Sequence, residues 1–274
     1  MKILLVDNGS LEPAATLALR QIARSLSAQT GREILPVSLL HSNKVALDQL
    51  EGIAGETVES FLSAQVAAGE TEFIVLPLFF GPSRAISEYL PGLVEKLRGE
   101  FPSITVRVAP TLFSSGDDTL VKMVADRVRE KLKADFSQDE TVRVALVDHG
   151  SPVAAVTAVR NALAEQLGLE LGTAVTEIAG CSMERRMGPE YDFNEPLLER
   201  LLARDGWNSG PVIVAQLFLA PGRHAGPDGD IAGICAQALA ASPGLRITRT
   251  EVLGTHPAMV TLLARRLKHL TGAD

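Results

Sequence analysis

The sequence predicts an α/β protein made of two tandem Rossmann-like domains, each with a four-stranded parallel sheet and helices on both faces. Three observations predict this fold. The chain has 274 residues, which suits two domains of ordinary size. Short apolar runs alternate with helical patterns along the chain, and its opening sequence recurs near the middle. Strict alternation of strands and helices implies parallel sheets with right-handed crossovers.

The repeat is clearest in two decamers that align without a gap. Residues 1–10 read MKILLVDNGS and residues 142–151 read VRVALVDHGS. A branched apolar run that ends in Asp-x-Gly-Ser is typical of a buried parallel strand followed by a tight turn into a helix. Residues 14–20 and 154–160 then share Ala-Ala-x-x-Ala-x-Arg, and residues 73–82 match 212–221. Three matches in one order indicate a duplication.

Four strand and helix pairs are expected in each half. In the first half we expect strands at 2–7, 34–40, 73–80 and 104–109, and helices at 11–27, 45–68, 86–98 and 118–133. In the second half we expect strands at 142–148, 174–180, 211–219 and 246–252, and helices at 153–167, 195–204, 230–241 and 257–270. The polar segment 134–140 lacks periodicity and is expected to be a linker. The predicted domains are therefore 1–135 and 141–274.

Composition excludes several classes of protein. The formal net charge of -7 argues against nucleic-acid binding. No segment approaches the roughly 20 apolar residues of a membrane span. The N-terminal apolar run meets Asp7 too early for a signal-peptide core, so a cytoplasmic location is expected. Cys181 and Cys235 are the only cysteines, which excludes a disulfide framework and a cysteine-based zinc site.

Three side chains that bind metals follow strands of the second half. His149 comes directly after strand 142–148, Glu184 follows strand 174–180, and His224 follows strand 211–219. Ligands of such sheets bind beyond the carboxyl ends of the strands, so the three are expected to face one cleft. Two imidazoles and one carboxylate suit a divalent transition metal with open coordination positions. For a single histidine of this kind, the alternative is a hydrogen-bonded structural residue.

The first half lacks these residues. Asn8 stands in the place of His149 and Ala85 in that of His224, while Ser42 or Asn43 is expected in that of Glu184. Joint loss is expected if the three act as one site, because an incomplete site binds metal poorly. The chain has neither the Gly-x-Gly-x-x-Gly nor the Gly-x4-Gly-Lys-Ser/Thr phosphate motif. A serine hydrolase is disfavoured, since no acid is placed to complete a triad.

Charged residues flank the expected ligands. Arg185, Arg186 and Arg223 are candidates for binding a carboxylate-bearing substrate, and the alternative is a solvated rim. Asp228 and Asp230 are expected to cap the following helix, with support of a metal ligand as the alternative.

These motifs resemble a known family. The run LVDHGS at 146–151, the strand-end Glu184 and the run QLFLAPGRHAGPDGDI at 216–231 resemble the sirohydrochlorin chelatases of the CbiX/SirB type. The resemblance covers essentially the whole chain as two chelatase-like domains, with specific motifs only in the second. It implies ATP-independent insertion of cobalt(II) or iron(II) into sirohydrochlorin, on the routes to cobalamin or sirohaem. The metal is then a substrate, and no permanently bound cofactor is expected.

The resemblance also implies roles for the residues. His149 would take protons from the pyrrole nitrogens and ligate the metal transiently, His224 would hold the metal from the opposite side, and Glu184 would balance its charge. The carboxylate-rich tetrapyrrole is expected to meet Ser151, Arg185, Arg186 and Arg223, with Lys44 and Arg84 of the first domain as further contacts.

Two other functions stay open at this point. A non-catalytic protein that stores or delivers metal or tetrapyrrole would keep the ligands but show no turnover. A metal-dependent hydrolase would hold its ion tightly and act on an ester or phosphate. The ligand types fit cobalt, iron and nickel alike, so the sequence does not choose among them. The chain is expected to be a monomer of two tandem domains or a homodimer.

Overall fold

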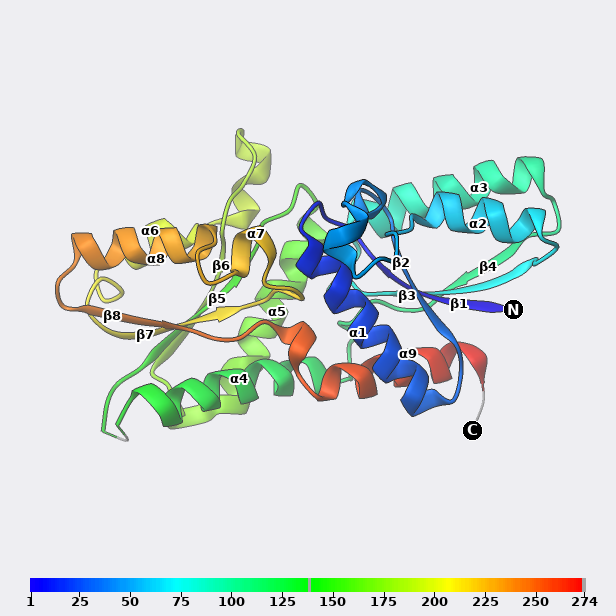
Figure 1. Ribbon diagram of the computed structural model, residues 1–274. Helices are drawn as coiled ribbons and strands as arrows, with labels where there is room; N and C mark the ends of the chain where they lie inside the picture. The colour runs from blue at the N-terminus through cyan, green and yellow to red at the C-terminus, as the bar shows by residue number, and fades with distance from the viewer. Residues whose placement is uncertain (138, 273–274) are drawn as a thin grey trace. The chain divides into compact units, whose positions relative to one another are not determined.

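The computed structural model describes residues 1–137 and 139–272, which form two compact units. The first unit comprises Met1–Asp117 and the C-terminal segment that starts at Pro257, and the second comprises Asp118–His256. Each unit holds a four-stranded parallel sheet (Figure 1). The two sheets have equivalent strand orders, β2-β1-β3-β4 and β6-β5-β7-β8. The predicted fold class is therefore confirmed.

In the first unit, helices cover both faces of the sheet. The strands are β1 (Lys2–Asp7), β2 (Ile34–Ser38), β3 (Glu72–Pro77) and β4 (Thr105–Val108), and the helices are α1 (Pro13–Thr30), α2 (Val58–Ala67), α3 (Leu90–Glu100) and α9 (Ala258–Thr271). Leu4 and Val6 of β1 share one apolar cluster with residues of α2 and α3. The alternate residues Ile3 and Leu5 are also buried, as expected for a strand covered on both sides. Helix α1 packs on β1 and β2, and α9 packs on α1 and β3.

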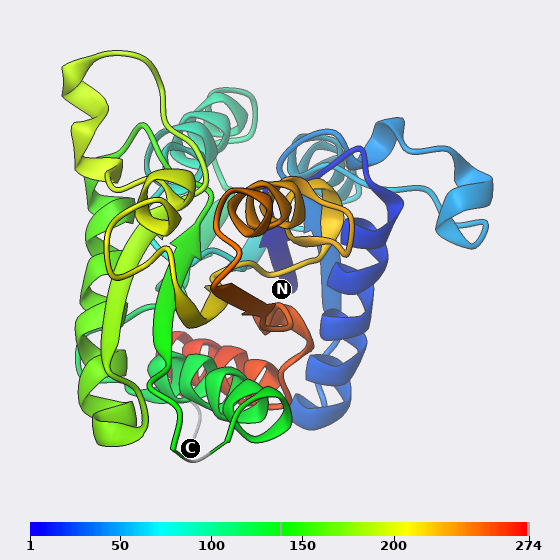
Figure 2. The same ribbon diagram turned by 90° about the vertical axis from the view of Figure 1, so that its left-hand side faces the viewer.

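The second unit repeats this arrangement. Its strands are β5 (Arg143–Asp148), β6 (Glu177–Ser182), β7 (Gly210–Gln216) and β8 (Leu245–Arg249), and its helices are α4 (Thr119–Asp135), α5 (Ala154–Leu171), α6 (Leu198–Leu202), α7 (Gly222–Ala225) and α8 (Asp230–Ala241). Residues of α6 and α8 share one apolar cluster with β5 and β7. Helices α4 and α8 lie on opposite sides of β8 (Figure 2).

The last helix of each half belongs to the other unit. Helix α4 packs on α5, β7 and β8, whereas α9 packs on α1 and β3. The boundaries of the compact units therefore differ from the expected domains 1–135 and 141–274, because the unit boundaries precede α4 and α9. An amphipathic helix must bury its apolar stripe, but the sequence of the stripe does not determine which of the two sheets the helix will cover.

The expected helix at 45–68 is broken in the structure. Two short 3₁₀ turns, η1 (Ser42–Lys44) and η2 (Leu47–Leu50), precede α2, which starts only at Val58. Arg20 donates hydrogen bonds to the carbonyls of Leu50, Ile53 and Ala54 at 2.8, 2.8 and 3.0 Å. These carbonyls are thus satisfied by a side chain instead of by a helical ladder. The apolar spacing of the segment was compatible with a helix, but the buried arginine holds it as a loop.

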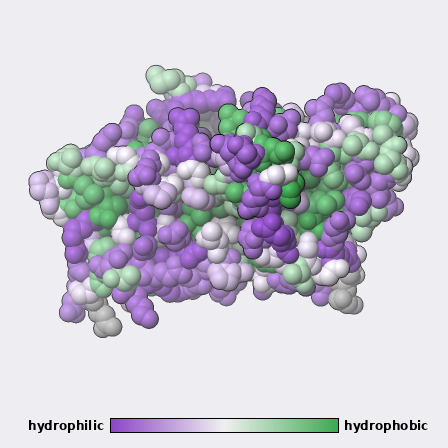
Figure 3. Space-filling view, viewed as in Figure 1, coloured by the Kyte–Doolittle hydropathy of each residue, from purple (hydrophilic) through white to green (hydrophobic). Residues whose placement is uncertain are grey.

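The surface is mixed in character. Figure 3 shows hydrophilic residues over most of the face seen there, with hydrophobic residues in separate patches. Among the described residues, no helix is both long enough and apolar enough to cross a membrane.

Asp7 closes β1 and is partly buried, with its Oδ1 atom shielded from solvent. Its Oδ1 atom has no hydrogen-bond partner among the described residues. Burial raises the pKa of Asp7 to about 6, although hydrogen bonds from Ser38 and from the backbone of Gly9 oppose the rise. Arg20, the counterpart of Arg160, is committed to backbone carbonyls. An ionised Asp7 is therefore a cost to the folded state.

We expect Asp7→Asn to stabilise the protein above about pH 6 and to flatten its pH dependence. The folded pKa lies above the ordinary value of 3.8, so between about pH 4 and pH 6 the folded state binds more protons than the unfolded state. The free energy of unfolding should then fall as pH rises through this window, by at most roughly 3 kcal/mol. Urea unfolding at several pH values measures this slope. An equally steep slope in Asp7→Asn would contradict the assignment.

Candidate metal centre

His149 and Glu184 are brought together by the parallel pairing of β5 and β6. The pairing continues past the strand ends, where Met183 donates its N–H to the Asp148 carbonyl at 2.7 Å and Glu184 donates to the His149 carbonyl at 3.1 Å. The two side chains therefore leave adjacent backbones at the carboxyl edge of the sheet. His149 Nε2 lies 3.5 Å from Glu184 Oε1.

Gly150 makes this approach possible. Its φ is +93°, in the region that favours glycine, and a Cβ there would lie 1.9 Å from the carbonyl oxygen of Glu184. Any larger residue would have to push the two backbones apart. The glycine of the repeated Asp-x-Gly-Ser motif thus sets the spacing between the histidine and the glutamate.

His224 reaches the same place from the segment after β7. It lies on the short helix α7, and its ring centroid is 4.7 Å from that of His149, with an angle of 72° between the rings. Its Nδ1 atom contacts Asp230 Oδ2 at 2.6 Å, and because a carboxylate accepts, Nδ1 is the donor and Nε2 is the nitrogen left for a metal. Such a carboxylate orients a metal-binding histidine and increases its basicity.

Asp230 was predicted to cap the following helix, and this prediction is wrong. The residue that precedes α8 is Gly229, and no side chain makes a capping hydrogen bond there. Asp230 is instead the first residue of α8 and turns its carboxylate to His224. The alternative role, support of a metal ligand, fits this contact.

The site is open to solvent. The side chains of His149, Glu184 and His224 are 47%, 63% and 31% exposed. His149 Nδ1 lies 3.1 Å from the carbonyl oxygen of Gly150, which leaves its Nε2 atom toward Glu184. In the described part of the chain, no group of three or more His, Cys, Asp or Glu side chains is arranged around one metal position. Of the three predicted ligands, His149 lies close both to Glu184 and to His224.

The two cysteines lie apart from this chemistry. Both are unpaired and buried. Burial raises the pKa of the Cys181 thiol strongly and that of Cys235 to about 11. Neither forms a thiolate near neutral pH, so neither supplies a thiolate ligand.

The three candidate arginines differ in their surroundings. Arg185 donates to Glu195 at 2.8 Å and to the Gly188 carbonyl at 3.0 Å, and its guanidinium lies 2.9 Å from Asp192. It therefore ties together the loop that follows β6. Arg186 is exposed and stands 6.0 Å from the centre of the Tyr191 ring.

Arg223 is also exposed. Its side chain is 76% exposed, and it lies 3.7 Å from Asp230. Ser151 starts the segment that leads into α5 and is partly buried. In the first unit, Lys44 ends η1, and Arg84 pairs with Glu88 at 3.4 Å. Both Lys44 and Arg84 are exposed.

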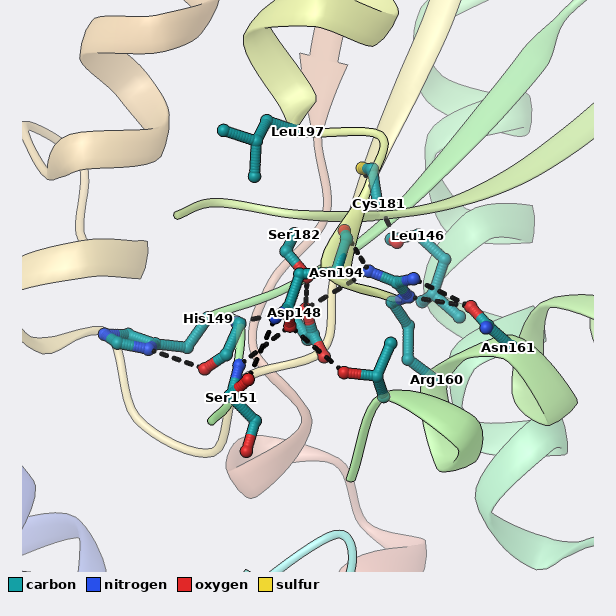
Figure 4. A network of polar contacts seen from close by, with 12 residues as sticks. Leu146, Asp148, His149, Ser151, Arg160, Asn161, Cys181, Ser182, Asn194 and Leu197 are labelled. Carbon is teal, nitrogen blue, oxygen red and sulfur yellow. Dashed lines mark hydrogen bonds and ion pairs between the residues drawn. The ribbon is translucent and has the colours of Figure 1, made fainter. Parts of the chain in front are cut away.

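A buried polar network, which the sequence did not single out, lies beneath the turn that carries His149 (Figure 4). Asp148 Oδ1 accepts from the Gly150 N–H at 3.1 Å and from Ser182 Oγ at 2.6 Å. Arg160 donates to the same Ser182 hydroxyl at 2.6 Å and to the Asn194 carbonyl at 3.1 Å. Burial raises the pKa of Asp148, and the charge of Arg160 opposes the rise.

The repeated motifs contained a signal for this network. Asp148 and Arg160 are both shared with the first half, as Asp7 and Arg20. An acid and a cation that recur in a duplication indicate a common structural task. Nothing in the sequence distinguished Asn194 from other loop residues.

The structural counterpart of Glu184 in the first unit is Leu40, and the expectation of Ser42 or Asn43 is wrong. Asp7 pairs with Ser38 as Asp148 pairs with Ser182. Leu40 donates its N–H to the Asn8 carbonyl at 3.1 Å, as Glu184 does to His149. The strand register fixes this position, whereas counting from an estimated strand end misplaced it by two or three residues.

Comparison with known proteins agrees with this architecture. The family described as CbiX matches residues 2–131 and 143–270. No curated protein matches the chain. SirB from Bacillus subtilis with Fe3+ is 20% identical, with a TM-score of 0.70 over 98% of this chain and 96% of that one.

Two further solved structures share the fold. SirB from Bacillus subtilis subspecies spizizenii in complex with cobalt is 18% identical, with a TM-score of 0.71 over 99% of this chain and 96% of that one. CbiX, described as the terminal enzyme for biosynthesis of siroheme in denitrifying bacteria, is 14% identical, with a TM-score of 0.63 over 98% of this chain and 99% of that one.

We expect Asp230→Asn to weaken Co²⁺ binding by about 10- to 100-fold, because an amide can donate as well as accept and so no longer fixes the tautomer and orientation of His224. Titration with Co²⁺, followed by its visible absorption, measures the affinity. Asp228→Asn is the matched control, since Asp228 is an exposed residue of the same segment. Equal losses in the two variants would argue against a specific role for Asp230.

Proposed function

Because the chain belongs to the CbiX family, we propose that it is a chelatase that inserts Co²⁺ or Fe²⁺ into sirohydrochlorin without ATP. The observation that carries this proposal is the meeting of His149 and His224, with ring centroids 4.7 Å apart and Glu184 3.5 Å from His149, at a solvent-open sheet edge. Relatives of the same fold are described with bound Fe3+ and cobalt.

The site supplies what metal insertion requires. The metal must exchange its water for protein ligands and then pass to the macrocycle, while two pyrrole N–H protons leave. The lone pair of His149 Nε2 serves first as transient metal ligand and, once the metal has passed to the macrocycle, as acceptor of one pyrrole proton, while the other proton passes to water at this solvent-open edge. His224, oriented by Asp230, contributes the second nitrogen, and Glu184 partly balances the charge of the ion. Few protein ligands suit a metal that has to be released.

Cationic side chains around the site suit the carboxylates of the tetrapyrrole. Arg186 and Arg223 have exposed guanidinium groups for this purpose. Ser151 begins the segment beyond His149 and offers its hydroxyl at this edge, since its N–H is donated to Asn194. Arg185 was included among the predicted anchors, but its ion pairs with Asp192 and Glu195 support a role in holding the loop. Lys44 and Arg84 remain predicted contacts of the first unit.

The metal is substrate, and no permanently bound cofactor takes part. We place the enzyme in the cytoplasm, as a monomer of two tandem units or a homodimer. Either Co²⁺ or Fe²⁺ fits the nitrogen and oxygen ligands.

The first experiment is a rate measurement. Sirohydrochlorin is mixed with Co²⁺ or Fe²⁺, and its absorbance change is followed with wild-type protein, His149→Ala and His224→Ala. We expect the wild type to insert the metal, and we expect the insertion rate to fall by at least about 100-fold in each variant. Each substitution removes a metal ligand, and His149→Ala also removes a proton acceptor. His269→Ala, an exposed histidine of α9, is the matched control.

Two outcomes would overturn the chelatase assignment. Binding of the tetrapyrrole by the wild type without faster insertion would favour a carrier. A tightly retained metal together with hydrolysis of an ester or phosphate would favour a hydrolase.

We expect Arg186→Ala to raise the KM for sirohydrochlorin by about 5- to 20-fold with little change in kcat, because the lost contact is to a substrate carboxylate remote from the reacting nitrogens. Steady-state kinetics measure both constants. Arg204→Ala removes an exposed arginine of the same unit and serves as control. An unchanged KM in Arg186→Ala would remove this residue from the substrate contacts.

A further inference from the structure

Asn194 is a fully buried amide that uses its whole hydrogen-bonding capacity. Its Oδ1 atom accepts from the Ser151 N–H at 2.9 Å and from Thr157 Oγ1 at 3.1 Å. Its Nδ2 atom donates to the carbonyls of Ser151 at 2.9 Å and Tyr191 at 3.1 Å. No surface of the side chain is exposed. An amide with four partners in a buried position is held in one orientation.

These bonds join the two segments that carry the candidate ligands. Ser151 lies two residues after His149 and is held at both its N–H and its carbonyl. Asn194 and Tyr191 belong to the excursion that begins after Glu184 and returns to α6. The side chain therefore fixes the His149 turn against the loop of Glu184, next to the buried network (Figure 4).

The turn has two separate anchors. Asp148 Oδ1 accepts from the Gly150 N–H at 3.1 Å, and Asn194 holds the next residue, Ser151. The Asp148 anchor and the close approach of Gly150 both exist in the first unit, where Asp7 accepts from Gly9 and a Cβ on Gly9 would lie 1.7 Å from the Leu40 carbonyl. The fold of the turn therefore does not need an asparagine.

The first unit lacks the second anchor. Ser38 forms an isolated β-bridge with Thr57, and Ser182 forms the equivalent bridge with Leu197. Thr57 therefore corresponds to Leu197, and Ala54, three residues before Thr57, corresponds to Asn194. Arg20 donates to the Ala54 carbonyl as Arg160 does to the Asn194 carbonyl, which supports this equivalence.

The partner of the amide is missing there as well. The aligned helices that end in Arg20 and Arg160 place Leu17 opposite Thr157. The asparagine and threonine pair thus occurs in the unit that has His149 and His224, and its counterparts in the other unit are both apolar.

We infer that Asn194 is a positioning residue for the metal site: its amide clamps the His149 turn so that His149 Nε2 is presented toward Glu184 and His224. The clamp acts through the backbone of Ser151 and touches neither metal nor tetrapyrrole. Its effect on turnover rests on the proposed chelatase function, whereas its effect on metal affinity does not.

The test compares wild-type protein with Asn194→Ala and Thr157→Val. Co²⁺ affinity is measured from visible absorption without tetrapyrrole, and kcat and KM for sirohydrochlorin are measured at temperatures well below each variant's Tm. For Asn194→Ala we expect Co²⁺ affinity and kcat to fall by about 10- to 100-fold, with KM within about twofold. For Thr157→Val, which removes one of the four bonds in a nearly isosteric change, we expect a fall of about threefold.

Asn161→Ala is the matched control. Asn161 accepts two hydrogen bonds from Arg160, at 3.0 and 2.8 Å, but does not contact the His149 turn. We expect it to lose stability and to keep its Co²⁺ affinity and kcat.

Three outcomes decide the inference. Wild-type Co²⁺ affinity in folded Asn194→Ala, or in Thr157→Val if Asn194→Ala does not fold, would overturn it. An equal loss in Asn161→Ala would overturn it too, since the effect would then be general destabilisation. Loss of Co²⁺ affinity in Asn194→Ala, in a protein whose wild type inserts no metal, would uphold the positioning role and reject the chelatase function.

Discussion

The close approach of two backbones at Gly150 is the constraint on which the second unit's site depends. A Cβ at this position would lie 1.9 Å from the Glu184 carbonyl, so only glycine lets the segments after β5 and β6 continue their pairing. The pairing sets His149 and Glu184 side by side before any side-chain contact is made. His224 then needs only to reach across from the segment after β7, where Asp230 fixes its ring.

Beneath this edge the protein buries a carboxylate and a guanidinium that form an ion pair bridged by a hydroxyl. Arg160 and Asp148 are 3.7 Å apart, and the Ser182 hydroxyl lies between them, 2.6 Å from each. Burying two charges is costly unless hydrogen bonds satisfy them, and here the Gly150 N–H and the Asn194 carbonyl complete the set. The first unit sends its arginine to loop carbonyls instead, which leaves Asp7 with an unpaired oxygen and a raised pKa.

The fold followed from the sequence because its signals are local and repeated. Each strand carries a short apolar run, and the two decamers place β1 and β5 directly. The assignment of α4 and α9 did not follow, since an apolar helical stripe fits either sheet equally well. The broken helix before α2 was missed because Arg20, far away in sequence, supplies its hydrogen bonds. In the site, strand ends located His149 and His224, whereas the Asp230 and Asn194 contacts depend on loop paths that carry no periodic pattern.

Comparison of the two units separates what builds the fold from what serves the metal. The acid, the glycine and the arginine of the motif occur in both units, as Asp7, Gly9 and Arg20 in the first and as Asp148, Gly150 and Arg160 in the second. The strand, the turn and the helix therefore require them in either unit. The residues His149, His224, Glu184, Asn194 and Thr157 occur in the second unit, and their counterparts in the first unit are all different. A buried amide with four partners is costly to leave half-satisfied, so it is retained only with all of its contacts. Its replacement by alanine together with Thr157's replacement by leucine is the pattern expected when the clamp has no ligand left to position.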